Sequence, residues 1–163
     1  MGGETGELRE RIEAIESCYE FMLAYAAQGL RSDQESPLRG QLRELLSRAA
    51  RAMDGLADAF RREAAALANG AAAADGGAEG LRQPQRDEGP MGDFAAVLER
   101  DTRASLAAVR LVLAQPSISS QLIDNLNALI HLRALLTDLF LIDELLAASA
   151  PAPGSSAADR RAV

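Results

Sequence analysis

The chain has 163 residues, 48% of them hydrophobic and 25% charged, which gives it enough apolar side chains to fold and excludes a wholly disordered chain. Its formal net charge is −7 and no segment is strongly basic, which argues against binding to the phosphate backbone of a nucleic acid. Aromatic residues make up only 4%, and alanine and leucine dominate the apolar residues, so the composition favours helices.

The first predicted helix covers about residues 7–28. Thr5 is its expected N-cap, and Gly29 is the expected left-handed residue that follows it. Glu20 is the only charge between Cys18 and Ala27, so this half of the helix is expected to be surrounded by protein. The apolar positions recur every three or four residues, at Leu8, Ile12, Ile15, Tyr19, Met22 and Ala26.

A second helix is predicted from Ser36, as N-cap, through Pro37 at the first helical position to about Ala68. Residues 69–90 follow as a predicted flexible linker. They contain five glycines and two prolines with almost no large apolar side chain, a composition that does not hold a packed element.

A third helix is predicted over residues 93–114 and a fourth over residues 120–148, with Pro116 ending the third and Ser117 or Ser119 capping the fourth. The fourth helix is apolar on two faces, although charged residues interrupt it often enough to argue against a membrane span. The tail, residues 149–163, is expected to be disordered. The predicted fold is therefore an all-α four-helix bundle of two helical hairpins, one domain over residues 1–148, with residues 69–90 as a linker inside it.

Three residues form a candidate polar site: Glu20, His131 and Asp138. His131 is the only histidine, and Asp124, Asn127 and Asp138 lie on the same face of one predicted helix with it. A single imidazole is a weak basis for a metal site, so a structural role is favoured for all three, and no metal or cofactor is expected. Cys18 cannot form an intramolecular disulfide and is expected to be a buried, unreactive thiol.

A cytoplasmic location is expected by default, because the single cysteine gives no sign of an oxidising compartment. The surplus of apolar surface on the first and fourth helices predicts a non-catalytic accessory, assembly or adaptor protein. It would bind a partner protein or a second copy of itself, with a homo-oligomer expected. The predicted partner-binding residues are Leu132, Leu135, Leu139, Ile142, Tyr19 and Met22.

An alternative is a small-ligand or cofactor-binding bundle that acts as a sensor, because bundles build such sites from side chains on facing helices. Its internal pocket would be lined by Tyr19, Tyr25, Phe21, Glu20 and His131. An enzyme is not expected, since few residues in the chain supply a base, a nucleophile or a metal ligand.

Overall fold

The computed structural model describes residues 3–74 and 89–149, and all regular structure in these residues is helical. The predicted all-α class is confirmed. Most of the predicted linker and nearly all of the predicted disordered tail lie outside the described residues. The elements are α1 (Gly3–Ala26), a 3₁₀ turn η1 (Asp33–Glu35), α2 (Arg39–Met53), α3 (Leu56–Ala74), α4 (Pro90–Leu113), α5 (Ser120–Asn127) and α6 (Ile130–Ser149).

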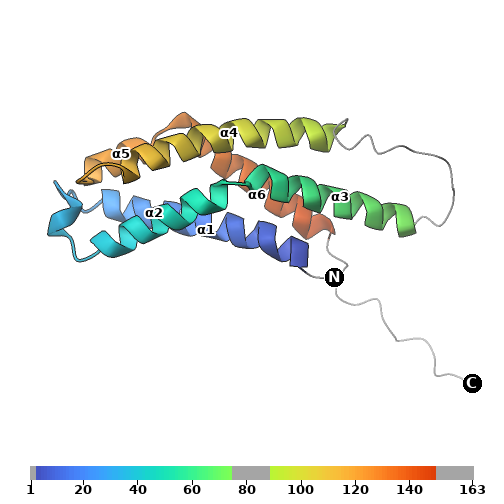
Figure 1. Cartoon of the computed structure of the whole chain (residues 1–163), viewed down its shortest axis with the longest axis horizontal. Helices are drawn as coiled ribbons and strands as arrows, with labels where there is room; N and C mark the ends of the chain where they lie inside the picture. The colour runs from blue at the N-terminus through green and yellow to red at the C-terminus, as the bar shows by residue number, and fades with distance from the viewer. Residues whose placement is uncertain (1–2, 75–88, 150–163) are drawn as a thin grey trace, which may run out of the picture.

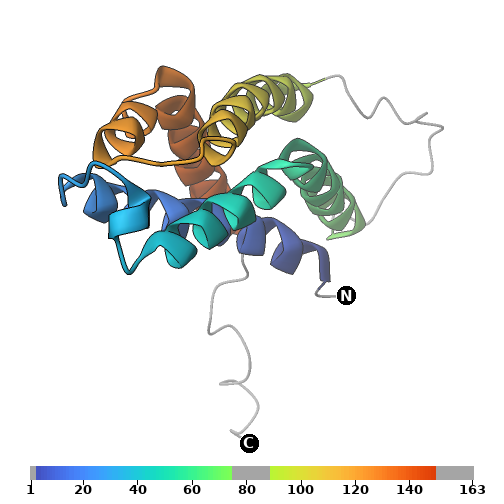
Figure 2. The same ribbon diagram turned by 60° about the vertical axis from the view of Figure 1, so that its left-hand side comes forward.

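The helices lie roughly along one long axis and enclose a single core (Figure 1, Figure 2). Helix α1 packs against α2, α3 and α5, whereas α4 packs against α2, α3 and α6. Helices α3 and α4 are also joined by an edge-to-face contact between Phe60 and Phe94, whose ring centroids are 5.5 Å apart. The largest fully buried side chains come from α1, α2, α3, α4, α5, α6 and the loop before α5.

The predicted helix over residues 36–68 is two helices, because the backbone breaks at Asp54 and Gly55. Gly55 has a φ of +88°, in the left-handed region that favours glycine. The guanidinium of Arg11, on α1, donates hydrogen bonds to the carbonyl oxygens of Arg51, Ala52 and Asp54 at 3.3, 3.1 and 2.7 Å. Arg11 therefore satisfies carbonyl groups that the end of α2 leaves without helical partners.

The predicted helix over residues 120–148 is also two helices, α5 and α6, separated at Ala128 and Leu129. Ser119 is the cap, since its side-chain oxygen accepts a hydrogen bond from the Leu122 N–H at 3.1 Å. Asn127, which has a low helix propensity, is the last residue of α5.

Three predicted boundaries are wrong, two of them by a turn or more. Helix α1 begins at Gly3, so Thr5 lies inside it and is not its N-cap. Ser36 and Pro37 belong to a turn before α2, in which the Ser36 side chain accepts a hydrogen bond from the Leu38 N–H. Helix α3 continues to Ala74, within the predicted linker. Residues 71–74 are all alanine, the residue type with the highest helix propensity, and they extend the helix.

None of the helices in residues 3–74 and 89–149 combines the length and the apolarity needed to cross a bilayer.

The break at Gly55 predicts opposite effects for two glycine-to-alanine changes. Gly55→Ala places a Cβ on a left-handed backbone and should lower the free energy of unfolding by about 1–2 kcal/mol. Gly40→Ala, inside α2 with open space around the added Cβ, should raise it by about 0.5–1 kcal/mol. Urea unfolding followed by circular dichroism measures both, and equal effects would contradict a break that requires glycine.

Candidate interaction face on helix α6

The outward side of α6 carries a group of large apolar side chains that the rest of the described chain does not cover. The exposed fractions are 74% for Ile130, 60% for Phe140, 49% for Leu141 and 36% for Leu145. Ile130, Phe140 and Leu141 lie on the same helical face as Thr137, and Leu145 flanks it one turn after Leu141. We call Ile130, Thr137, Phe140, Leu141 and Leu145 the α6 outer face.

Other exposed large hydrophobic residues occur singly on separate helices: Leu23 on α1, and Met91 and Leu111 at opposite ends of α4. Single exposed apolar side chains are normal on a soluble surface, whereas a contiguous group marks a contact site. The α6 outer face is therefore the apolar surface that needs an explanation.

The structure corrects the residues on which the predicted interaction face was built. Five of the six point into the core with exposed fractions of 2% or less: Leu132, Leu135, Leu139, Ile142 and Met22. Tyr19 is half-buried and packs against the core. The reason is the rotation of α6 about its axis, which turns one of its two apolar faces towards the interior and the other outwards.

The three predicted polar residues are not brought together. Glu20 is exposed on α1, and His131 is exposed at the start of α6. The break at Ala128 and Leu129 also separates His131 from Asp124 and Asn127, which belong to α5. The expected stripe of polar side chains on one helix is therefore interrupted.

Asp138 is the one member of that group with a distinctive environment. Burial first, and the charge of Asp101 on α4 second, raise the pKa of its carboxyl, while Arg100 opposes the rise. Arg100 also pairs with Asp101, with Nε and Oδ1 3.2 Å apart. One oxygen of the Asp138 carboxyl is buried with no hydrogen-bond partner among the described residues, so this carboxyl is easier to protonate than an exposed one.

Cys18 is buried, and burial raises the pKa of its thiol to about 12. The thiolate, the reactive form, is therefore scarce at neutral pH, as expected from the sequence.

A polar junction that was not predicted from the sequence joins two loops at one end of the molecule. Asp33, in η1, is fully buried, and its carboxylate accepts hydrogen bonds from the Ile118 N–H at 2.9 Å and from Arg43 Nε at 2.8 Å. Arg43 also donates to the carbonyl oxygens of Leu113 and Gln115 at the end of α4. Burial alone would raise the pKa of Asp33, but these donors and the nearby arginine charges hold it below its usual value.

The same junction contains two further buried side chains that bridge the loops. The Tyr25 hydroxyl donates to the Ile118 carbonyl at 2.9 Å. The Ser120 hydroxyl donates to the Tyr25 carbonyl at 2.8 Å and accepts from the Leu30 N–H at 2.9 Å. The side chains of Asp33, Arg43, Tyr25 and Ser120 are thus all engaged in hydrogen bonds that hold the two loops together.

Two of the surface clefts formed by the described residues lie near charged side chains. One, of about 220 Å³, lies at the break between α2 and α3 and is lined by Asp54, Asp58, Arg61, Glu99 and Arg103 together with apolar residues. Arg61 bridges Asp58 and Glu99 at 2.8 and 2.7 Å, and Arg103 binds Glu99 at 2.7 Å, so these charges are already paired. The other, of about 420 Å³, lies beside Arg31 and the start of α5. Within the described ranges, no three histidine, cysteine or acidic side chains are grouped closely enough to hold a metal ion.

No protein-family model matches this chain, and no curated protein or solved structure is significantly similar to it.

The buried charge of Asp33 predicts a pH-dependent loss of stability. Because its folded pKa lies below the unfolded value of about 4, its contribution is complete above that pH and is lost as the pH falls through the folded pKa. Asp33→Asn should lower the free energy of unfolding by about 3 kcal/mol at pH 7, and the deficit should shrink below about pH 4.

Urea unfolding between pH 3 and pH 7 measures this difference. Glu44→Gln is the control, because Glu44 makes only an exposed ion pair with Arg51, and its removal should change stability by less than about 0.5 kcal/mol. A deficit for Asp33→Asn that stays constant down to pH 3 would contradict the assigned ionisation.

Replacement of two buried serines by alanine should change the stability of the protein in opposite directions. Ser105 on α4 is fully buried, and its hydroxyl has no hydrogen-bond partner among the described residues, so Ser105→Ala should stabilise the protein by about 0.5–1.5 kcal/mol. Ser120 makes two buried hydrogen bonds, so Ser120→Ala should destabilise it by about 1–3 kcal/mol. Thermal and urea unfolding measure both, and a destabilised Ser105→Ala would show that its hydroxyl is engaged.

Proposed function

We propose that this chain is a non-catalytic accessory protein that binds another protein surface through the α6 outer face. The observation that carries the proposal is the grouping of Ile130, Phe140, Leu141 and Leu145 on one side of one helix. Large exposed apolar side chains grouped on one side of a helix favour contact with another protein, because covering them removes apolar area from water.

We also propose a fold in which α2 with α3, and α5 with α6, act as two broken rods of a four-helix bundle. In this interpretation α1 forms a hairpin with α2 and α3, and α4 forms a second with α5 and α6. The contacts of α1 with α2, α3 and α5, and of α4 with α2, α3 and α6, support the arrangement. The α6 outer face then lies on the outside of the last rod, where a partner helix can pack along it.

The alternative, a ligand-binding sensor, has less support from the geometry. Its pocket would require Tyr25, Glu20 and His131 to face one cavity. The Tyr25 hydroxyl is bound to Ile118, and Glu20 and His131 are exposed on different helices. Neither cleft described above is lined by any of the three.

The test compares Phe140→Glu with Leu111→Glu. Both residues are exposed on helices, at 60% and 66%, so neither change should unfold the protein, but only Phe140 belongs to the α6 outer face. A substitution at a buried residue such as Leu139 would confound binding with folding.

Each full-length variant is immobilised, and proteins retained from an extract of the cell that makes this chain are quantified. We expect wild type and Leu111→Glu to retain the same proteins, including further copies of the chain, and Phe140→Glu to lose them. Equal retention by all three, with unchanged melting curves, would refute the proposal.

A further inference from the structure

We infer that the partner on the α6 outer face is a second copy of this chain, with the two α6 helices antiparallel. This inference rests on the proposed function, and it adds an occupant and an orientation. It is carried by two charged side chains, Arg133 and Glu144, that lie on the same side of α6 as the apolar group.

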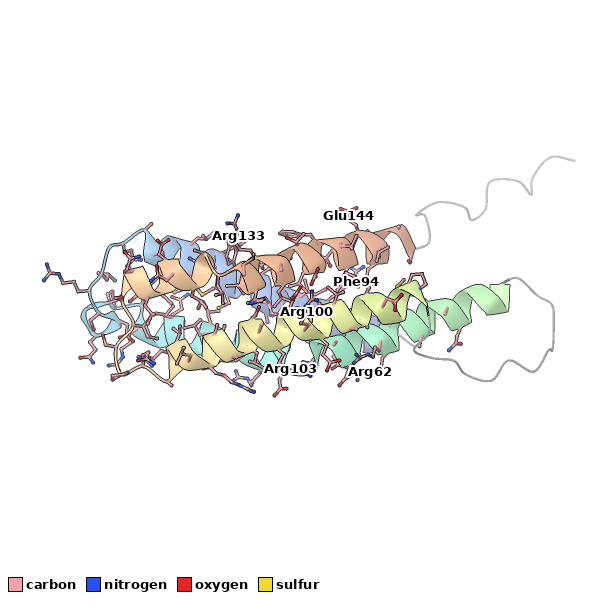
Figure 3. All side chains as sticks on the ribbon, turned by 90° about the horizontal axis from the view of Figure 1, so that it is seen from above. Arg62, Phe94, Arg100, Arg103, Arg133 and Glu144 are labelled. Carbon is pink, nitrogen blue, oxygen red and sulfur yellow. The ribbon has the colours of Figure 1, made fainter. Side chains whose placement is uncertain are left out.

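Arg133 and Glu144 are both exposed and point away from α4 (Figure 3). They are eleven residues apart, which places them about 16 Å apart along the helix. Among the residues that the structure describes, neither forms an ion pair within its own chain. Each is therefore free to pair with a group outside it.

The residues of this side repeat with alternating spacings of three and four, the pattern of a seam between two packed helices. In order they are Ile130, Arg133, Thr137, Phe140, Glu144 and Ala147.

This seam is symmetric in the way that an antiparallel pair of identical helices requires. Arg133 and Glu144 lie at equal distances from the midpoint of residues 138 and 139, so each arginine would meet the glutamate of the other copy. Thr137 and Phe140 are related by the same midpoint, as are Ile130 and Ala147. A two-fold interface needs a patch that complements itself, and this patch does so in both charge and side-chain size.

The local contacts agree with this pairing. The Thr137 hydroxyl donates to the Arg133 carbonyl at 2.9 Å, so it is satisfied within its own helix and its methyl group can contact the Phe140 ring of the other copy. Leu141, beside the seam, would lie over Ala134 of the other copy, a small side chain that leaves room for it. A parallel pair would instead bring Arg133 against Arg133 and Glu144 against Glu144.

Charge reversal tests the inference with the purified, full-length protein. Arg133→Glu leaves two glutamates on each seam, and Glu144→Arg leaves two arginines, so each variant alone should dimerise at least about tenfold more weakly than wild type. An equimolar mixture of the two variants restores both opposite-charge pairs and should form a heterodimer of wild-type affinity. Sedimentation velocity over a range of protein concentrations and two salt concentrations measures wild type, the two separate variants and their mixture.

The outcomes separate this inference from the proposed function. A wild-type protein that stays monomeric to about 100 μM, or variants that dimerise like wild type, would overturn the second-copy inference. So would a mixture no tighter than the separate variants. The proposed function would still stand if Phe140→Glu lost a different protein from the extract, and it would fall only if no association depended on Phe140.

Discussion

The fold depends on a buried carboxylate, that of Asp33, which joins the loop after α1 to the distant loop after α4. An ionised carboxylate inside a protein is destabilising by several kcal/mol unless donors or cations occupy its oxygens. Here the Ile118 N–H and the Arg43 guanidinium do so, and Arg43 in turn binds two carbonyl groups at the end of α4. The loop after α1 and the loop after α4 must therefore stay in one relative position, since displacement of either exposes an unpaired charge to the interior.

This constraint extends along the chain to α6. Ser120, the first residue of α5, exchanges hydrogen bonds with Leu30 and also binds Tyr25, so the start of α5 is fixed against the end of α1. The break at Ala128 and Leu129 then sets a new direction for α6, which packs on α4. The rotation of α6 about its axis follows from these contacts, and it decides which leucines enter the core and which side of α6 faces outwards.

The sequence predicted the all-helical class, a cap at Ser117 or Ser119, of which Ser119 is the one found, and the left-handed Gly29, since each depends on residues close together in the chain. It missed the break at Gly55, because a single glycine is tolerated in many helices and the Arg11 contacts that stabilise this break come from about 40 residues away. It placed the interaction face on Leu132, Leu135, Leu139 and Ile142, which are buried. Periodicity could not choose between two apolar sides of one helix, because that choice depends on packing with α4. The junction at Asp33 had no local signal of any kind.

The two sides of α6 differ in composition, and each composition suits its surroundings. The inward side is built of leucine and isoleucine alone at its centre, which suits a dry interior, whereas the outward side combines Ile130 and Phe140 with Arg133 and Glu144. A helix side that faces only water gains nothing from a large exposed ring, and a side buried permanently in a core would leave two charges unpaired. Apolar side chains between opposite charges, symmetric about one point, suit a surface that is exposed in the free chain and covered in a complex. An antiparallel copy provides both the apolar cover and the opposite charge at each end. The same side of α6 can therefore keep its charges solvated in the free chain, and bury its apolar side chains beside paired charges in the dimer.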